Sequence, residues 1–216
     1  MTRALEGNGA GIVREHAIAA AVQRSLEHLY GIDRVADVHD FIEVAEEGER
    51  ETLFVREAQD GTLEMSLRLP PLAKKEFAVE SSADLDPLCQ LIEGVSHFVY
   101  LAERARVDRE ATQLELELQA EVDKYVVLAA SLGKIEVRHS EALRVRLYDS
   151  VSFNDAEGSE LGDRYRMAND LAGKFVRRLE RDFIAKGRYA ELRHQLRLFF
   201  HMGQEEKMRF SLARAA

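Results

Sequence analysis

Residues 62–71 read Thr-Leu-Glu-Met-Ser-Leu-Arg-Leu-Pro-Pro. Apolar residues alternate here with polar ones, and a period of two is typical of a strand with one buried face. Pro70 and Pro71 then end the pattern, because proline lacks the amide N–H that a sheet ladder uses. Beyond the connector 72–83, apolar residues recur at helical spacing. The stretch therefore marks the change from a β-rich segment to an α-helical one.

The residues before this stretch predict one helix and two further strands. The helix covers about 13–30 and ends at Gly31, which can adopt the left-handed conformation of a helix end. The strands are 38–44 and 52–56, separated by polar turn sequences, and 62–69 is the third. We expect the three to form an antiparallel meander, with a possible short edge strand at residues 76–79.

The residues after the connector predict helices only. The stretch 134–152 is ambiguous, because Leu143-Arg144-Val145-Arg146-Leu147 alternates like a strand although its apolar residues also fit a helix; we interpret it as a helix. Gly187 and Gly203 mark breaks between the last helices. The predicted helices cover 86–105, 108–132, 134–152, 160–186, 188–202 and 204–213.

These elements predict an α+β protein that is mostly helical, with a small three-stranded antiparallel β-meander near the N-terminus followed by a helical array. We expect residues 1–12 to be a flexible lead. Residues 13–83 would form a helix-and-meander subdomain, and residues 84–216 a helical region packed with it as one domain.

Composition narrows the class of protein. The 216 residues are 46% hydrophobic and 32% charged, as in a soluble globular protein, and no apolar run is long enough to span a membrane. The N-terminus lacks the apolar stretch of a secretory signal, so we expect a cytoplasmic location. Cys89 is the single cysteine, which excludes an internal disulfide and a thiolate-cluster metal site.

Charge is distributed unevenly along the chain. The formal net charge is −9, but residues 1–160 hold 32 Asp and Glu against 17 Lys and Arg, whereas residues 161–216 hold 13 Lys and Arg against 7 Asp and Glu. Such asymmetry indicates either an anionic partner for the basic part or neutralisation of one part by the other.

One polar arc suggests metal chemistry. Glu93 and His97 are four residues apart in the helix 86–105, so they share a face with Tyr100 and Arg104 while the opposite side is apolar. The next helix carries Glu117 and Glu121 at the same spacing. If the two helices pack antiparallel, three carboxylates and an imidazole could bind a cation, as in bundle metal sites.

Two Glu-x-x-His pairs resemble half of a di-iron bundle signature, which needs such a pair on each of two helices. Glu136 and His139 form the first pair, and Glu191 and His194 the second. The first lies in the ambiguous stretch and the second among arginines that would repel a cation. A solvated face with local ion pairs is therefore the alternative interpretation of all these carboxylates.

The basic C-terminal helices carry two cationic ridges. The helix 160–186 has an apolar stripe, and its opposite side holds Lys174, Arg177, Arg178 and Arg181. The next helix adds Arg193 and Arg197. These ridges could bind phosphates, an acidic protein surface, or the acidic part of the same chain.

We expect a non-enzymatic cytoplasmic protein that acts through a protein partner or as a homo-oligomer, because amphipathic helices and segregated charge are present without a convergent catalytic set. The first alternative is a metal-dependent enzyme centred on the carboxylates and histidine of the polar arc. The second is binding of an anionic ligand or nucleic acid by the basic helices, which the overall negative charge opposes. No motif identifies a cofactor, and no segment indicates a membrane.

Overall fold

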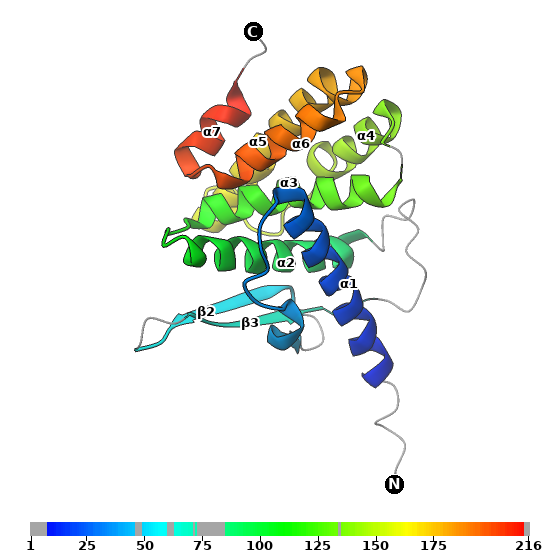
Figure 1. The fold of residues 1–216 in the computed structure, drawn as a ribbon. Coiled ribbons are helices and arrows are strands. Elements are labelled where there is room, and N and C mark those ends of the chain that lie inside the picture. Colours follow the sequence, from blue (N-terminus) through cyan, green and yellow to red (C-terminus); the bar gives the residue numbers. More distant parts are fainter. Residues whose placement is uncertain are drawn as a thin grey trace. The chain divides into compact units, whose positions relative to one another are not determined.

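A computed structural model describes residues 8–45, 49–59, 63–70, 72, 85–133 and 135–213 (Figure 1). The chain divides into two compact units. Unit 1 comprises Met1–Glu27 and Asp33–Arg109, and unit 2 comprises His28–Ile32 and Glu110–Ala216. The first helix, α1 (Asn8–Tyr30), therefore contributes its last turn to unit 2.

Unit 1 contains a mixed three-stranded sheet. Its strands are β1 (Ile42–Val44), β2 (Thr52–Glu57) and β3 (Leu63–Leu69), in the order β1-β3-β2. β3 pairs parallel with β1, with Ile42 opposite Leu67, and antiparallel with β2, with Leu53 opposite Leu67. The three predicted strands and the mostly helical α+β class are confirmed, but the purely antiparallel meander is wrong.

Burial explains why the third strand takes the centre. Leu67 and Leu69 of β3 are buried, whereas β2 is exposed along almost its whole length. A central strand is covered on both edges and an edge strand is not, so the strand that carries the buried leucines lies between the other two.

Some predicted boundaries shift for local reasons. Residues 38–41 form a 3-10 turn, η1 (Val38–Phe41), rather than strand, because the Asp37 side chain accepts a hydrogen bond from the His39 amide and caps the turn. α1 includes residues 8–12, which the sequence analysis assigns to the lead. The possible strand at 76–79 lies outside the described residues.

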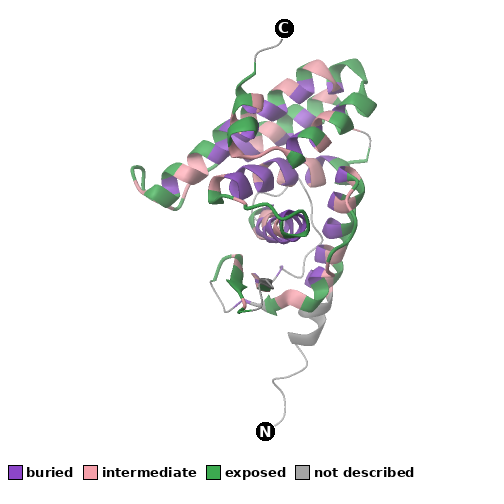
Figure 2. Ribbon diagram, turned by 60° about the vertical axis from the view of Figure 1, so that its left-hand side comes forward, coloured by how far each residue is buried: buried purple, intermediate pink, exposed green. Residues whose placement is uncertain are grey.

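The helix α2 (Leu85–Arg106) packs on the sheet of unit 1 and contacts β3 and β2 (Figure 1). Most of its residues are buried, and Figure 2 shows this burial on the helix beside the sheet. Gly94 makes the close packing possible. A Cβ atom at this position would lie 2.7 Å from Leu67 Cδ1 and 2.8 Å from Glu51 Cγ.

Unit 2 is helical throughout its described part. Its central helix, α5, packs against α3, α4 and α7. The helices are α3 (Gln113–Ser131), α4 (Val137–Arg144), the π-helical turn η3 (Val145–Asp149), α5 (Glu160–Asp182), the 3-10 turn η4 (Ile184–Lys186), α6 (Tyr189–His201) and α7 (Gln204–Leu212).

Caps and buried rings account for the boundaries and packing of unit 2. Thr112 and Ser159 accept hydrogen bonds from backbone amides and begin α3 and α5. On α5, Phe175 is fully buried and stacks on Phe199 of α6 with ring centroids 4.4 Å apart. The predicted apolar stripe of this helix is therefore its core face. Among the described residues, no helix combines the length and apolar character needed to cross a membrane.

Candidate functional site

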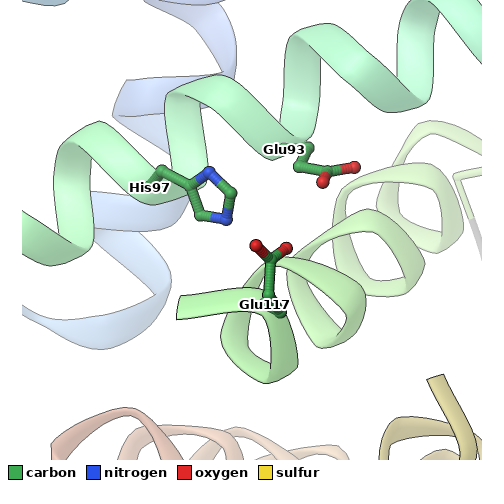
Figure 3. A group of neighbouring side chains, drawn as sticks. All are labelled: Glu93, His97 and Glu117. Atoms are coloured by element: carbon green, nitrogen blue, oxygen red, sulfur yellow. The ribbon is translucent and has the colours of Figure 1, made fainter. Parts of the chain in front are cut away.

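Glu93 and His97 lie one turn apart on α2, and Figure 3 shows both side chains on the same side of that helix. His97 is buried, with 9% of its surface exposed, and Glu93 is half-buried. Farther along the predicted arc, Arg104 Nε donates a hydrogen bond to the Tyr100 hydroxyl at 3.1 Å, and both residues are buried. The arc is therefore an enclosed set of polar groups and not a solvated face.

A further residue of unit 1, Glu51, approaches His97 from the segment just before β2. Glu51 Oε1 lies 3.6 Å from His97 Nδ1, and the two side chains are only 10% and 11% exposed. A carboxylate that is buried this far needs a charged or hydrogen-bonding partner. The sequence pattern did not predict this role for Glu51, because its contact with α2 depends on how the sheet packs against that helix.

Several contacts hold Glu51 in place. Its backbone N–H donates to Gln90 Oε1 at 3.1 Å, and Gln90 Nε2 in turn donates to Asp86 Oδ2 at 2.6 Å, so two residues of α2 anchor the start of β2. Gly94 leaves the space that the Glu51 stem occupies. The first two turns of α2 thus position this carboxylate beside the imidazole.

This arrangement has a defined chemistry. A carboxylate beside Nδ1 favours the tautomer that carries its proton on Nδ1, and it fixes the orientation of the ring. Nε2 is then the basic nitrogen of His97, which is the form of imidazole that binds a metal or accepts a proton. The carboxylate of Glu93, one turn away, adds an oxygen donor of the same helix.

Glu117 and Glu121, the other predicted ligands, lie on α3 of unit 2. Glu117 is buried, and Figure 3 shows its side chain extending from α3. Glu121 is half-buried, and its Oε1 accepts a hydrogen bond from Lys124 Nζ at 2.7 Å. This ammonium group neutralises Glu121, which makes Glu121 a poor candidate ligand.

The two Glu-x-x-His pairs have a different environment. Glu136 and His139 are exposed at the start of α4, and Glu191 and His194 are exposed on α6. Glu191 accepts a hydrogen bond from Arg188 Nε at 3.1 Å. These exposed pairs fit the interpretation of a solvated face with local ion pairs.

The cationic ridge of α5 is defined as Lys174, Arg177, Arg178 and Arg181. Lys174, Arg177 and Arg181 are exposed and pair with nearby acids, whereas Arg178 is half-buried. Lys174 Nζ lies 2.6 Å from Asp170, Arg177 lies 3.7 Å from Asp149 of η3, and Arg181 lies 2.8 Å from Asp182. Carboxylates of unit 2 itself therefore neutralise part of the ridge.

Arg178, the fourth residue of the ridge, and the two predicted arginines of α6 have no acid pair among those described above. The Arg178 guanidinium lies over the Phe210 ring, 4.3 Å from its centroid, and burial lowers the pKa of this group. Arg197 Nε donates to the Leu29 carbonyl at 2.6 Å and so caps the last turn of α1. Arg193 is exposed on α6. Arg178 and Arg197 thus have structural roles that the sequence analysis did not predict.

Comparison with protein-family models, with curated proteins and with solved structures found no match to this chain.

Proposed function

We propose that this protein binds a divalent transition-metal ion through His97 and Glu93 of α2. One observation carries the proposal: a buried carboxylate, Glu51, lies beside Nδ1 of a buried histidine whose helix presents Glu93 one turn away. Histidine ligands in metalloproteins usually have a carboxylate at their other ring nitrogen. Here the 3.6 Å between Glu51 Oε1 and His97 Nδ1 is an electrostatic contact and is longer than a hydrogen bond.

The donor set defines the class of metal. Glu93 and His97 of α2 supply one carboxylate group and one imidazole nitrogen (Figure 3). Mixed nitrogen and oxygen donors suit zinc, iron(II) and manganese(II), whereas the lack of thiolates is unfavourable for soft metals such as copper(I). A metal bound through this imidazole and carboxylate would keep coordination positions for water and lower the pKa of that water, which is the basis of metal-dependent hydrolysis.

Metal analysis tests this proposal directly. We expect protein purified without chelator to contain about one metal ion per chain, and apo-protein to bind Zn²⁺ or Mn²⁺ in calorimetry with that stoichiometry. His97→Gln and Glu93→Gln should abolish stoichiometric binding. Glu51→Gln should weaken it by about 10–100-fold, because the ligand stays while its orientation is lost.

The matched control is His139→Gln, which removes a histidine from an exposed pair on α4. It should leave binding unchanged. Wild-type protein that takes up no metal, or His97→Gln protein that binds as wild type does, would contradict the proposal. Circular dichroism of each variant separates loss of a ligand from loss of the fold.

We propose binding of an acidic protein surface by the ridge as a second candidate function. The supporting observation is exposure: the side chains of Lys174, Arg177 and Arg181 are 48%, 62% and 54% exposed. Exposed ion pairs contribute only about 0–1 kcal/mol, so the local aspartates are weak competitors. A partner that supplies several carboxylates can replace them.

Two polyanions distinguish this candidate from its alternatives. Protein-partner binding predicts that immobilised polyglutamate retains the protein at low salt and that Lys174→Glu with Arg177→Glu and Arg181→Glu removes the retention. Retention by heparin alone would favour an anionic ligand or nucleic acid. Retention by neither, with an oligomeric state that the triple variant does not change, would reject both.

A further inference from the structure

His16 of α1 and His39 of η1 bring two imidazole rings into direct contact within unit 1. Their Nδ1 atoms lie 2.5 Å apart, and the rings meet edge to face with centroids 4.3 Å apart. Two nitrogens at this distance share one hydrogen, so one ring donates an N–H and the other accepts it with a bare nitrogen. The contact therefore depends on the number of protons that the pair holds.

Acidic residues flank both histidines in the sequence. Glu15 precedes His16 on α1, whereas Asp37 and Asp40 flank His39 on the other side. Burial, followed by the neighbouring His39, lowers the pKa of His16, and Glu15 opposes that change. Desolvation and the facing ring thus outweigh the nearest carboxylate.

A second link between α1 and this segment carries no titratable group. Gln23 Nε2 donates to the Ala36 carbonyl at 2.6 Å, and Gln23 Oε1 accepts from the Val38 amide at 2.9 Å. Near neutral pH, protonation can therefore open the contact at His39 while Gln23 still holds Ala36 and Val38. The expected response is local opening of η1 and not global unfolding.

We propose that the His16–His39 contact is a proton-operated latch between α1 and η1. A first proton leaves it closed, because a ring that carries both N–H groups still donates to the bare nitrogen of the other. A second proton removes that acceptor and places two cations in direct contact. The latch then opens, and the 3-10 turn that leads into β1 is released.

The sign of the pH dependence follows from His16. Its lowered pKa means that the open state binds more protons, so the closed state is fully populated above the ordinary histidine value of about 6.5 and is lost as the pH falls below it. The His39→Gln variant offers a separate test. The amide N–H of the new side chain can donate to His16 Nδ1, and this side chain cannot take up a proton to become the second cation of the pair.

Hydrogen exchange of the His39–Phe41 amides, corrected for intrinsic rates, measures the latch, because Gln23 continues to hold the Val38 amide. From about pH 7.5 to about pH 5, wild-type protection of these amides should fall by about tenfold or more. His39→Gln should retain protection at both values. The control His28→Gln, at an exposed histidine of α1, should respond as wild type does.

Other results would overturn the proposal. Equal loss of protection in wild type and His39→Gln, or two histidine NMR titrations that are independent of each other, would show that the rings do not share a proton. Loss of protection on adding a chelator at about pH 7.5 would show that a metal joins the rings instead. His39→Gln leaves Glu93 and His97 intact, so its comparison with wild type is independent of metal binding at α2. For the chelator test, His97→Gln protein that also loses protection would place the metal at the paired rings.

Discussion

A methyl group at position 94 has no space in unit 1, and this single position couples the sheet to α2. The methyl carbon would meet Leu67 Cδ1 at 2.7 Å and Glu51 Cγ at 2.8 Å. Leu67 is fully buried and cannot move away without displacing the core, whereas Glu51 would lose its place beside His97. Stability and the candidate site therefore both depend on this glycine.

We predict that Gly94→Ala lowers the free energy of unfolding by about 1–2 kcal/mol. Overpacking costs about 1–3 kcal/mol, which outweighs the gain of up to about 1 kcal/mol from the helix propensity of alanine. Urea unfolding measures the change. Gly203→Ala is the control, since no atom lies within 4 Å of a Cβ there. A variant that gains stability at position 94 would show that Leu67 and Glu51 relax freely.

For individual residues, the sequence predicts only those neighbours that the repeat of a helix or strand brings together. Glu93 and His97 could be paired from their spacing because a helix repeats every few residues. Glu51 could not, because its contact with His97 requires β2 to pack on α2 through Gly94. The pairing of His16 with His39 depends in the same way on tertiary structure.

Elements of unit 2 are joined by a buried polar chain that runs from α3 to α5. The Tyr125 hydroxyl lies 2.6 Å from Ser140 Oγ, Ser140 Oγ donates to Glu180 Oε1 at 2.7 Å, and Arg144 Nε donates to Glu180 Oε2 at 2.6 Å. Because Ser140 gives its hydrogen to Glu180, Tyr125 is the donor to Ser140. This chain of hydrogen bonds thus needs the Tyr125 phenol in its protonated form.

We predict that these hydrogen bonds make the free energy of unfolding sensitive to alkaline pH. Burial raises the pKa of Tyr125 well above its usual value, against the hydrogen bond with Ser140, which lowers it. The folded state therefore holds its proton more tightly than the unfolded state, so stability is intact below about pH 10 and declines as the pH rises further. Urea unfolding between about pH 8 and pH 11 should show the decline.

The same series with Tyr125→Phe should be flatter above about pH 10, because the phenol that titrates is gone. Tyr189→Phe, at an exposed tyrosine of α6, controls for the loss of one phenol. An unchanged pH profile in Tyr125→Phe would mean that Tyr125 does not limit alkaline stability.

Among the secondary-structure elements, the order of the strands was predicted wrongly from the sequence pattern. Alternation in residues 62–69 identifies a strand, but it contains no information about which edge the neighbours occupy. Burial of Leu67 and Leu69 between β1 and β2 sets that order. The helices were predictable because their hydrogen bonds are local, although Asp108, with φ at 52°, and the Thr112 cap delay the start of α3.

Across the whole molecule, the end of α1 belongs to the second unit. The Tyr30 ring stacks on Phe200 with centroids 4.1 Å apart. Its hydroxyl donates to Asp123 Oδ1 and accepts from Gln119 Nε2 at 3.0 Å. Residues near the two ends of the chain are thus joined through one buried side chain.

We predict that Tyr30→Leu lowers the free energy of unfolding by about 2–4 kcal/mol, since it removes a stacked ring and leaves buried polar groups with fewer partners. Exchange of amides in α3 and α6 should accelerate. His28→Ala, at an exposed position of the same helix, should change stability by no more than about 0.5 kcal/mol. Unchanged protection of α3 in Tyr30→Leu would show that α1 is not an anchor of unit 2.

Periodicity along the chain predicts the α+β class, most helix boundaries, the core face of α5 and the arc that carries Glu93 and His97, because each of these follows from a short repeat of apolar residues. Tertiary packing sets the central place of β3, the contact of Glu51 with His97, the pairing of aspartates with part of the ridge and the entry of Tyr30 into the core of unit 2. These features depend on contacts between residues distant in sequence, and such contacts form only when packed elements exclude water from both partners.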